Sequence, residues 1–442
     1  MHKGEMFSGG TTGPALLLFG VALFLRLFLA PYPGFPGDMA VNLAYVNQAN
    51  AHGVTSVPDL FAGTDSEMLP PLFVYQAAAV GRFATGRLAA LRQQYPSVAD
   101  VWERVRFKLL PIAYDMVTGL VILLVLGNLA PAPWPLVGAA GYLLNPGVVI
   151  NSAYWGQFDS IHSFFLLLVV LCLCRGWRTT HDGWLIGAWL VFALAVCAKL
   201  QSIVLLPVLF AVTIVHRKPA KALIAMAGCG LAVTALYSPF LLVHRWDYLE
   251  RVFVRSFTRY GNTCVNGFNL WGLWVVRPSA ERVLGLSYAH LGQLLYLGCV
   301  GWYCVWLARA VSARIGQETS RQLLLVAAYA CVAPFMVLTG MHERYIAPAI
   351  VFLVMAACLD RRLWWLAVGF SVTYALNLLY VLWKSGPAPP EEWAIRDASK
   401  FALRVFSSLL NIALFGWLTV KLSALLVPGS SEQVGSSSVP SA

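Results

Sequence analysis

Charged residues are scarce in this chain. Only 12% of its 442 residues are charged, whereas 59% are hydrophobic and the mean hydropathy is +0.69. Soluble globular proteins are about 25% charged and about 45–50% apolar. The composition therefore excludes a soluble multidomain enzyme and an intrinsically disordered chain. So much apolar sequence over this length predicts many membrane-spanning segments instead.

Three further patterns are missing. The nine cysteines form no CxxC pair and eight lie inside apolar runs, so neither a disulfide scaffold nor a cysteine metal site is predicted. Runs such as 164–174 do not alternate between apolar and polar residues, which excludes the strands of an outer-membrane barrel. The first apolar run, Pro14–Ala30, is long for a signal peptide and lacks a clear cleavage site, so we expect a retained helix.

What is present is a series of apolar segments. We predict an all-α polytopic membrane protein with about twelve transmembrane helices, at 14–30, 108–127, 135–150, 160–174, 184–198, 200–215, 222–241, 289–308, 322–340, 346–359, 363–383 and 401–421. Several are shorter than the ~20 residues of a full crossing, which is typical of helices that pack inside a protein or line a cavity. Residues 1–427 are predicted to form one domain, and the Ser/Gly-rich segment 428–442 a disordered cytoplasmic tail.

The distribution of basic residues predicts the topology. The net charge of +11 comes from residues that flank apolar spans, where they meet lipid phosphates, so membrane lipids and not nucleic acid are the predicted partners. Basic residues concentrate in the short loops 175–183, 216–221, 309–321 and 360–362, whereas the alternate short loops 151–159 and 341–345 hold only Arg344. The positive-inside rule places the first set in the cytoplasm and the second set outside.

Two long loops then fall on the outer face, at 31–107 and 242–288. The first contains an apolar stretch, 70–81, which is too short to span and is predicted to lie in the outer interface with its following arginines towards headgroups. In the second, Arg251, Arg255 and Arg259 recur every four residues. This spacing predicts a basic helical face that rests on anionic headgroups or holds a lipid-linked phosphate.

Ionisable residues in or beside membrane spans are costly and are therefore functional candidates. Asp38 follows the first span in PGFPGDM, and Asp159 begins a later span, both on the predicted outer face. Each is a candidate catalytic carboxylate, and the alternative for each is a helix N-cap. The turn before Asp159 favours a site because it offers many hydrogen-bonding and stacking groups, namely Asn151, Tyr154, Trp155 and Gln157.

Several cations accompany these acids. His342, Glu343 and Arg344 lie in MHERY at the outer end of a span, where an arginine can bind a phosphate in bidentate fashion; the alternative is an interfacial Glu–Arg pair. Lys199 lies between two short apolar runs and must reach water, an anion or a buried acid. Lys108 lies two helical turns from Asp115, so the alternative for it is a structural charge pair.

Together these motifs resemble the GT-C superfamily of membrane glycosyltransferases, and most closely bacterial enzymes related to the second mannosyltransferase of GPI-anchor synthesis. The matching pieces, in the family's order, are PGD (36–38), PPL (70–72), KLLPIAYD (108–115), NP…WGQFD (145–159), AKLQ (198–201), NGFNLWG (266–272) and MHERY (341–345). The resemblance implies an outward-facing site, a catalytic aspartate in the first outer loop and a polyprenyl-phosphate sugar donor. The protein O-mannosyltransferase branch carries an Asp-Glu pair in this loop, whereas Asp38 is followed by Met39, which argues against a protein acceptor.

The expected function is transfer of a hexose such as mannose from a polyprenyl-phosphate donor to a hydroxyl of a glycan or lipid, with inversion, at the outer face of a bacterial inner membrane. Asp38 is expected to act as general base, and Asp159 to position the acceptor or assist as a second carboxylate. Arg344 and His342, followed by Lys108 and Lys199, are expected to bind the donor phosphate. The remaining expected substrate contacts are Glu343, Trp155, Gln157, Asn266, Asn269 and Trp271.

Two alternatives stay open at this point. No ligand set has diagnostic metal spacing, so no cofactor is predicted, but a divalent metal is not excluded. The second alternative is a transporter or flippase of a lipid-linked glycan, which should show an internal repeat and polar residues at the midplane of broken helices. No repeat is apparent and the acids cluster on one face, which favours the enzyme.

Overall fold

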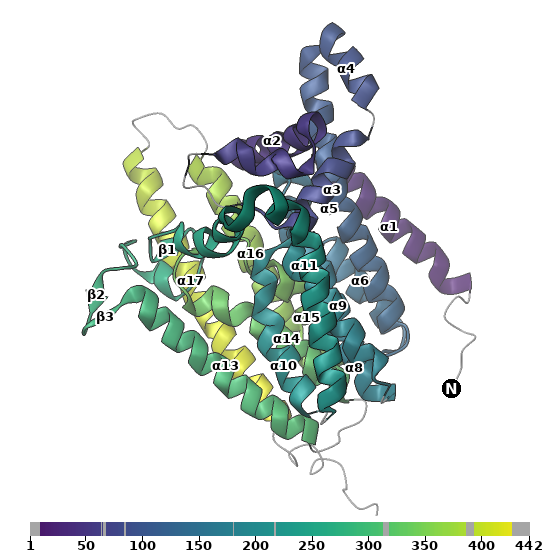
Figure 1. Ribbon diagram of the computed structural model, residues 1–442. Helices are drawn as coiled ribbons and strands as arrows, with labels where there is room; N and C mark the ends of the chain where they lie inside the picture. The colour runs from purple at the N-terminus through teal and green to yellow at the C-terminus, as the bar shows by residue number, and fades with distance from the viewer. Residues whose placement is uncertain are drawn as a thin grey trace, which may run out of the picture.

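The structure is a bundle of long helices with a cap of short helices at one end (Figure 1). This computed structural model describes residues 9–62, 64, 68–83, 85–179, 181–215, 218–312, 318–385 and 393–426. The prediction of an all-α polytopic membrane protein is confirmed. The predicted tail at 428–442 lies outside the described residues.

Thirteen helices of the described residues form the bundle. They are α1 (Gly9–Leu29), α5 (Pro96–Leu126), α6 (Trp134–Leu143), α7 (Pro146–Val149), α8 (Asp159–Thr179), α9 (Gly183–Ala198), α10 (Leu206–Val215), α11 (Pro219–Leu249), α13 (Tyr288–Ser312), α14 (Glu318–Val337), α15 (Ala347–Leu359), α16 (Trp364–Ser385) and α17 (Trp393–Leu426). Helix α15 is apolar on every side and contacts α14, α8, α16 and α6. A helix that is apolar all round is expected in the centre of a bundle, and Ala347–Cys358 is indeed entirely buried.

Helix length limits how many of these helices can cross a membrane. Among the described residues, seven helices are long and apolar enough to cross a membrane, or eight if Trp134–Leu143 and Pro146–Trp155, bent by 43°, count as one span. Three shorter apolar helices are Gly183–Ala198, Leu200–Val215 and Ala347–Leu359. All twelve predicted segments fall on helices, but the count of twelve crossings stays a prediction.

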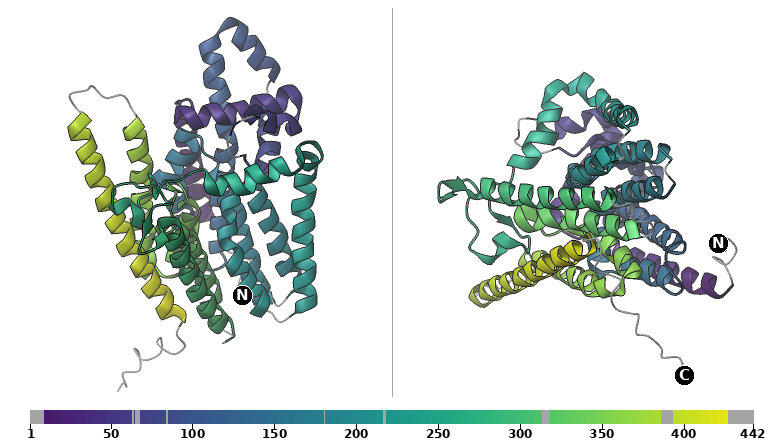
Figure 2. Two further views of the ribbon diagram at one scale, coloured as in Figure 1. Left: turned by 60° about the vertical axis from the view of Figure 1, so that its left-hand side comes forward. Right: turned by 90° about the horizontal axis from the view of Figure 1, so that it is seen from below.

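The first long loop folds as the cap of the bundle. It contains α2 (Pro36–His52), the 3₁₀ segment η1 (Val54–Phe61), α3 (Pro71–Arg82) and α4 (Thr85–Gln94), and α2 lies across the end of the bundle (Figures 1 and 2). Helix α3 packs against α2, α5 and α9, and it buries Phe73, Val74 and Ala77 completely. Protein therefore covers the apolar face of 70–81, and its position in the outer interface stays a prediction.

The second long loop fastens this cap. It continues α11 through the π-helix η4 (Glu250–Arg255) and α12 (Ser256–Thr258). Arg251 Nη1 donates to the carbonyl of Phe61 over 2.7 Å, and Arg255 Nη1 donates to the carbonyl of Thr64 over 3.1 Å. The π-helix also breaks the regular four-residue spacing. The predicted basic stripe facing headgroups is thus wrong for Arg251 and Arg255, because they bind the first loop.

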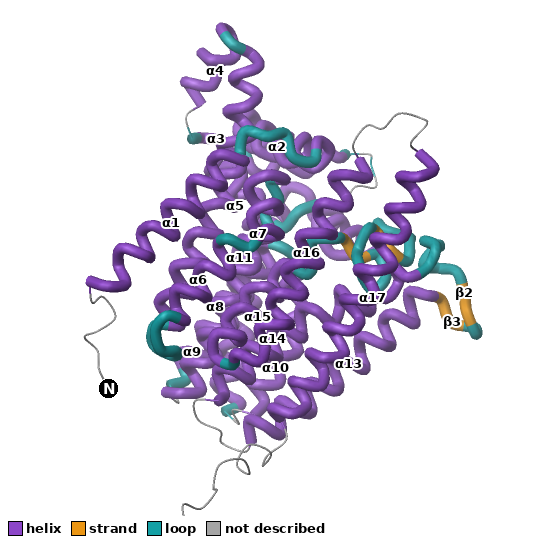
Figure 3. Tube along the Cα trace, turned by 180° about the vertical axis from the view of Figure 1, so that it is seen from behind, coloured by secondary structure: helices purple, strands orange, loops and turns teal. Residues whose placement is uncertain are grey.

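Part of the second loop enters the bundle without being a long helix. Strand β1 (Cys264–Val265) pairs in parallel with β4 (Met341–His342), and η5 (Leu270–Leu273) follows; a separate hairpin, β2 (Arg282–Val283) with β3 (Leu286–Ser287), projects beside α17 (Figure 3). Asn377 Oδ1 accepts from Phe268 N over 2.9 Å, and Asn411 Nδ2 donates to Phe268 O over 2.7 Å. Irregular backbone inside a membrane protein requires such buried partners.

A buried ion pair fastens α1 to the bundle. Arg26 Nε donates to Asp115 Oδ2 over 3.1 Å, and neither side chain is exposed. Tyr142 and Ser152 hydroxyls also donate to Asp115, over 3.0 and 2.5 Å. Asp115 therefore pairs with Arg26, and the alternative pairing with Lys108 is wrong.

This pair generates a stability prediction. Asp115→Leu should destabilise the protein by about 3–5 kcal/mol, because it leaves a buried guanidinium without its counter-ion. The double variant Arg26→Met with Asp115→Leu should recover most of the loss, since it buries no unpaired charge. Thermal unfolding in detergent measures both, with Asn128→Ala, in the exposed turn after α5, as a control. A double variant as unstable as Asp115→Leu would contradict the prediction.

Candidate active site

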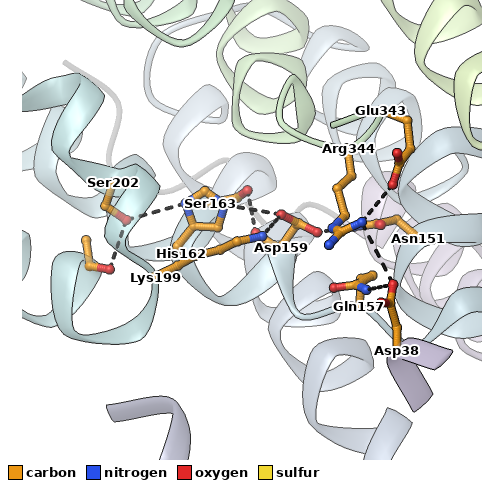
Figure 4. A network of polar contacts seen from close by, with 11 residues as sticks. Asp38, Asn151, Gln157, Asp159, His162, Ser163, Lys199, Ser202, Glu343 and Arg344 are labelled. Carbon is orange, nitrogen blue, oxygen red and sulfur yellow. Dashed lines mark hydrogen bonds and ion pairs between the residues drawn. The ribbon is translucent and has the colours of Figure 1, made fainter. Parts of the chain in front are cut away.

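Polar side chains from five segments of the chain meet in one network of contacts (Figure 4). Asp38 comes from α2, and Arg344 and Glu343 follow β4. Asp159 begins α8, and Lys199 lies between α9 and the 3₁₀ segment η3 (Leu200–Leu205). The remaining contributors follow or belong to the π-helix η2 (Ile150–Trp155), namely Trp155, Asn151 and Gln157.

Asp38 is held by one of its two carboxylate oxygens. Trp155 Nε1 donates to Oδ2 over 2.9 Å, and Gln157 Nε2 donates to the same oxygen over 2.5 Å. Arg344 Nη1 lies 3.8 Å from Oδ2 as well. Among the described residues no group bonds Oδ1, and the side chain is 31% exposed. Helix α2 begins at Pro36 with Phe35 at the N-cap, so the alternative of Asp38 as N-cap is wrong.

The π-helix explains how Trp155 and Gln157 both reach Asp38. After its wide last turn the chain reverses at Gly156, whose φ of +85° favours glycine, and Gln157 N then bonds Asn151 O over 2.9 Å. This reversal directs the side chains on either side of Gly156 towards one carboxylate. Single π-helical turns are frequent at functional sites, which agrees with this position.

Arg344 joins two acids. Its Nη1 donates to Glu343 Oε1 over 2.7 Å and also approaches Asp38. Burial alone would raise the pKa of the Glu343 carboxyl. The charge of Arg344, followed by the contact with His342, outweighs this effect, so the pKa lies well below its usual value. Among the described residues Arg344 Nε has no hydrogen-bond partner. The predicted internal Glu–Arg pair exists, and the same guanidinium keeps donor capacity for a ligand.

Asp159 is enclosed on both oxygens, in contrast to Asp38. Lys199 Nζ and His162 Nε2 both approach Oδ1, the latter at 3.5 Å, while Asn151 Nδ2 donates to Oδ2 over 3.1 Å. The carboxylate is only 1% exposed. It contacts side chains and no backbone N–H among the described hydrogen bonds, so the alternative of an N-cap is not seen. The predicted buried acid beside Lys199 is thereby identified.

Lys199 is fixed from more than one side. In addition to the contact with Asp159, its ammonium lies 5.1 Å from the ring centre of Phe158 and 5.7 Å from that of Tyr345. An ammonium over aromatic faces gains cation–π attraction. Lys199 is therefore held between an acid and two aromatic rings.

The cluster also contains residues that the sequence reasoning missed. His162 lies one helical turn after Asp159, and its Nδ1 is 3.4 Å from the hydroxyl of Ser202, which extends the network towards α9 (Figure 4). The signal was available, because a histidine three residues into an apolar span is an intramembrane ionisable group. Ser202 gave no such signal, since hydroxyl residues occur throughout membrane helices.

The other expected site residues fall into two groups. His342 borders the cluster, 3.6 Å from Glu343, and pairs through its backbone with Asn266. Asn269 and Trp271 do not reach it: Asn269 Oδ1 accepts the backbone N–H of Trp271, and Trp271 Nε1 donates to Val337 O over 2.9 Å. These two residues hold the buried loop in place, and none of their described hydrogen bonds goes to an acid of the cluster.

Lys108 also lies apart from the acids. Its ammonium donates to the backbone carbonyls of Tyr32 and Tyr154, each over 2.6 Å. A metal site does not emerge either: the described residues contain no group of three or more His, Cys, Asp or Glu side chains placed to hold an ion. The carboxylates of the cluster are instead neutralised by Arg344 and Lys199.

The fold and site thus define a polytopic membrane protein with paired carboxylates and cations at one end. Residues 157–271, about a quarter of the chain, match the sequence profile of the ALG3 protein family. This is a family of membrane mannosyltransferases in the GT-C class. The match supports a glycosyltransferase at this level, and it contains Asp159 and Lys199 but neither Asp38 nor Arg344. No curated protein sequence matches the chain.

The depressed pKa of Glu343 generates a pH prediction. A carboxyl whose folded pKa lies below its unfolded value of about 4.3 adds stability above that value and loses it as the pH falls below it. Glu343→Gln should therefore lower stability at pH 7 by about 1.5–3 kcal/mol, by loss of a charged hydrogen bond, and should flatten the decline below pH ~4.3. Thermal unfolding between pH 7 and pH 3 measures this. Parallel curves for wild type and variant would contradict it.

Proposed function

We propose that this protein transfers a hexose, mannose in keeping with the family match, from a polyprenyl-phosphate donor to a hydroxyl of a glycan or lipid acceptor. The observation that carries the proposal is the asymmetry of the two carboxylates. Asp38 Oδ2 is held by Trp155 and Gln157, while Oδ1 has no partner among the described residues. Both oxygens of Asp159 are occupied. Asp38 is therefore suited to accept a proton, and Asp159 to keep Lys199 in place.

The proposed step is a single displacement. The acceptor oxygen forms a bond to the anomeric carbon while the bond from that carbon to the phosphate oxygen breaks. The electron pair leaves with the polyprenyl phosphate, and the acceptor proton passes to Asp38 Oδ1. One displacement inverts the anomeric centre. A positioned carboxylate contributes typically 10²–10⁴-fold to such a proton transfer.

The leaving phosphate needs cations, and Arg344 is best placed to supply them. Lys108 is occupied by two carbonyls and Lys199 by Asp159, whereas Arg344 Nε is without a partner among the described residues. His342 Nε2 likewise has none and lies beside Glu343. Donors fixed in a poorly hydrated site stabilise charge that develops in the transition state more than water does.

The location follows from the lipid. A polyprenyl donor stays in the bilayer, so its phosphate must be met at the membrane interface. Helix α2, which carries Asp38, lies across one end of the bundle (Figure 1). Charge asymmetry of the short loops supports an outward orientation. We infer an inner membrane of a bacterium, with the site facing the periplasm or exterior.

The role of Asp38 has a direct test. Asp38→Asn keeps size and some hydrogen bonding but removes the basic oxygen, so turnover should fall by about 10² or more. Purified protein in lipid is assayed with a panel of polyprenyl-phosphate sugars, and binding of free polyprenyl phosphate is measured by competition. Asp59→Asn, on the exposed part of the first loop, is the control and should keep full turnover.

Two outcomes would count against the proposal. Near-normal turnover of Asp38→Asn would remove Asp38 as the base. Absence of sugar transfer from every donor, together with movement of a lipid-linked glycan across vesicles, would favour the transporter.

The orientation has its own test. Cysteine introduced at Leu284, which is 99% exposed in the β2–β3 hairpin, should react with an impermeant thiol reagent added to intact cells. Cysteine at Lys218, in a short loop predicted to be cytoplasmic, should react only after the membrane is opened. Both variants need a background without the native cysteines. The reverse labelling pattern would overturn the orientation.

A further inference from the structure

Lys108 presents a buried cation without a buried anion. Its side chain has no exposed surface, and among the described ion pairs it has no carboxylate partner. Its ammonium donates instead to two backbone carbonyls, those of Tyr32 and Tyr154, over 2.6 Å each. Burying a charge is costly unless it is compensated, so this arrangement calls for a role.

The two carbonyls belong to the two segments that form the Asp38 site. Tyr32 lies in the turn between α1 and α2, six residues before Asp38, and Tyr154 precedes Trp155 in η2. Charge-assisted hydrogen bonds are roughly twice as strong as neutral ones. Lys108, on the separate helix α5, therefore ties both segments to one fixed point.

The seam between these segments is packed closely. A Cβ atom at Gly34, where φ is +68°, would lie 2.5 Å from the carbonyl oxygen of Trp155, so no side chain fits there. The rings of Phe35 and Trp155 stack at 5.3 Å, and those of Tyr32 and Tyr154 lie 5.7 Å apart. A small change in the separation of the segments would therefore move the indole and amide donors relative to the Asp38 carboxylate.

We propose that Lys108 is a positioning residue, which fixes the separation of the turn before α2 from η2 and thereby orients Asp38 against Trp155 and Gln157. Only the expected effect on turnover rests on the proposed function; the positioning role itself does not. This role replaces the expectation that Lys108 binds the donor phosphate, because the ammonium is fully buried and points at backbone carbonyls.

The chain offers a matched control on the same helix. Arg106, also buried, donates from Nη1 to the carbonyls of Gly81 and Phe83, over 3.0 and 3.1 Å. It makes the same kind of double contact two residues earlier, but at the end of α3 and not beside Asp38. Lys108→Met and Arg106→Met therefore remove comparable buried bonds with different neighbours.

The first experiment separates positioning from phosphate binding and from folding. Lys108→Met should lower kcat about 10²-fold, because a misplacement of reacting groups by roughly 1 Å has an effect of this size. The concentration of free polyprenyl phosphate needed for competition should stay within about twofold of the wild-type value. Lys108→Arg, which keeps a cation, should recover part of the loss. Arg106→Met should keep kcat within about threefold at a similar loss of folded yield. If competition by polyprenyl phosphate is weakened tenfold or more in Lys108→Met, Lys108 binds the phosphate. If both methionine variants lose kcat equally, Lys108 has a structural role only.

A second experiment does not depend on activity. Spin labels at Val41 on α2 and Leu144 before η2, both exposed positions, report the separation of the two segments by pulsed electron resonance. The distance distribution should broaden or shift in Lys108→Met and stay unchanged in Arg106→Met. An unchanged distribution in Lys108→Met would overturn the proposal. If the wild-type protein transfers no sugar but the distance still shifts in Lys108→Met, the proposed function is refuted and the positioning role stands.

Discussion

The structure depends on the cost of leaving a charge or a backbone group unpaired in an apolar interior. Several buried ionic groups have partners within the described part of the protein: Arg26 pairs with Asp115, Lys199 with Asp159, and Lys108 with two carbonyls. These contacts join segments far apart in the chain, and they fix where helices and loops meet. Polar groups that are costly alone thus hold the site and the bundle together.

The same constraint divides the two acids. Asp159 has both oxygens paired and almost no exposure. Asp38 is held by one oxygen only and is partly exposed, which is why we propose it as the proton acceptor. Arg344 lies between Glu343 and Asp38, so two acids orient the guanidinium that we propose for the leaving phosphate. Such preorganisation is the main source of electrostatic catalysis in enzymes.

The two long loops are structural parts of the site and not separate appendages. Arg251 and Arg255 attach the second loop to the first, and the first carries Asp38. Asn377 and Asn411 hold the loop that follows β1, whose neighbour β4 leads into Glu343 and Arg344. The position of each reactive side chain is therefore set by backbone contacts made outside the motif that contains it.

Composition and apolar run length determined the class: an all-α polytopic protein follows from the scarcity of charge, and the expense of intramembrane ionisable residues singled out Asp38, Asp159, Lys199 and Arg344. Only the tertiary structure decided which groups pair. Lys108 and Asp115 share a helix yet have different partners, and Asn269 and Trp271 turned out to support a loop. Spacing along a chain defines a helix face, but pairing in a low-dielectric interior depends on which distant segment packs against that face.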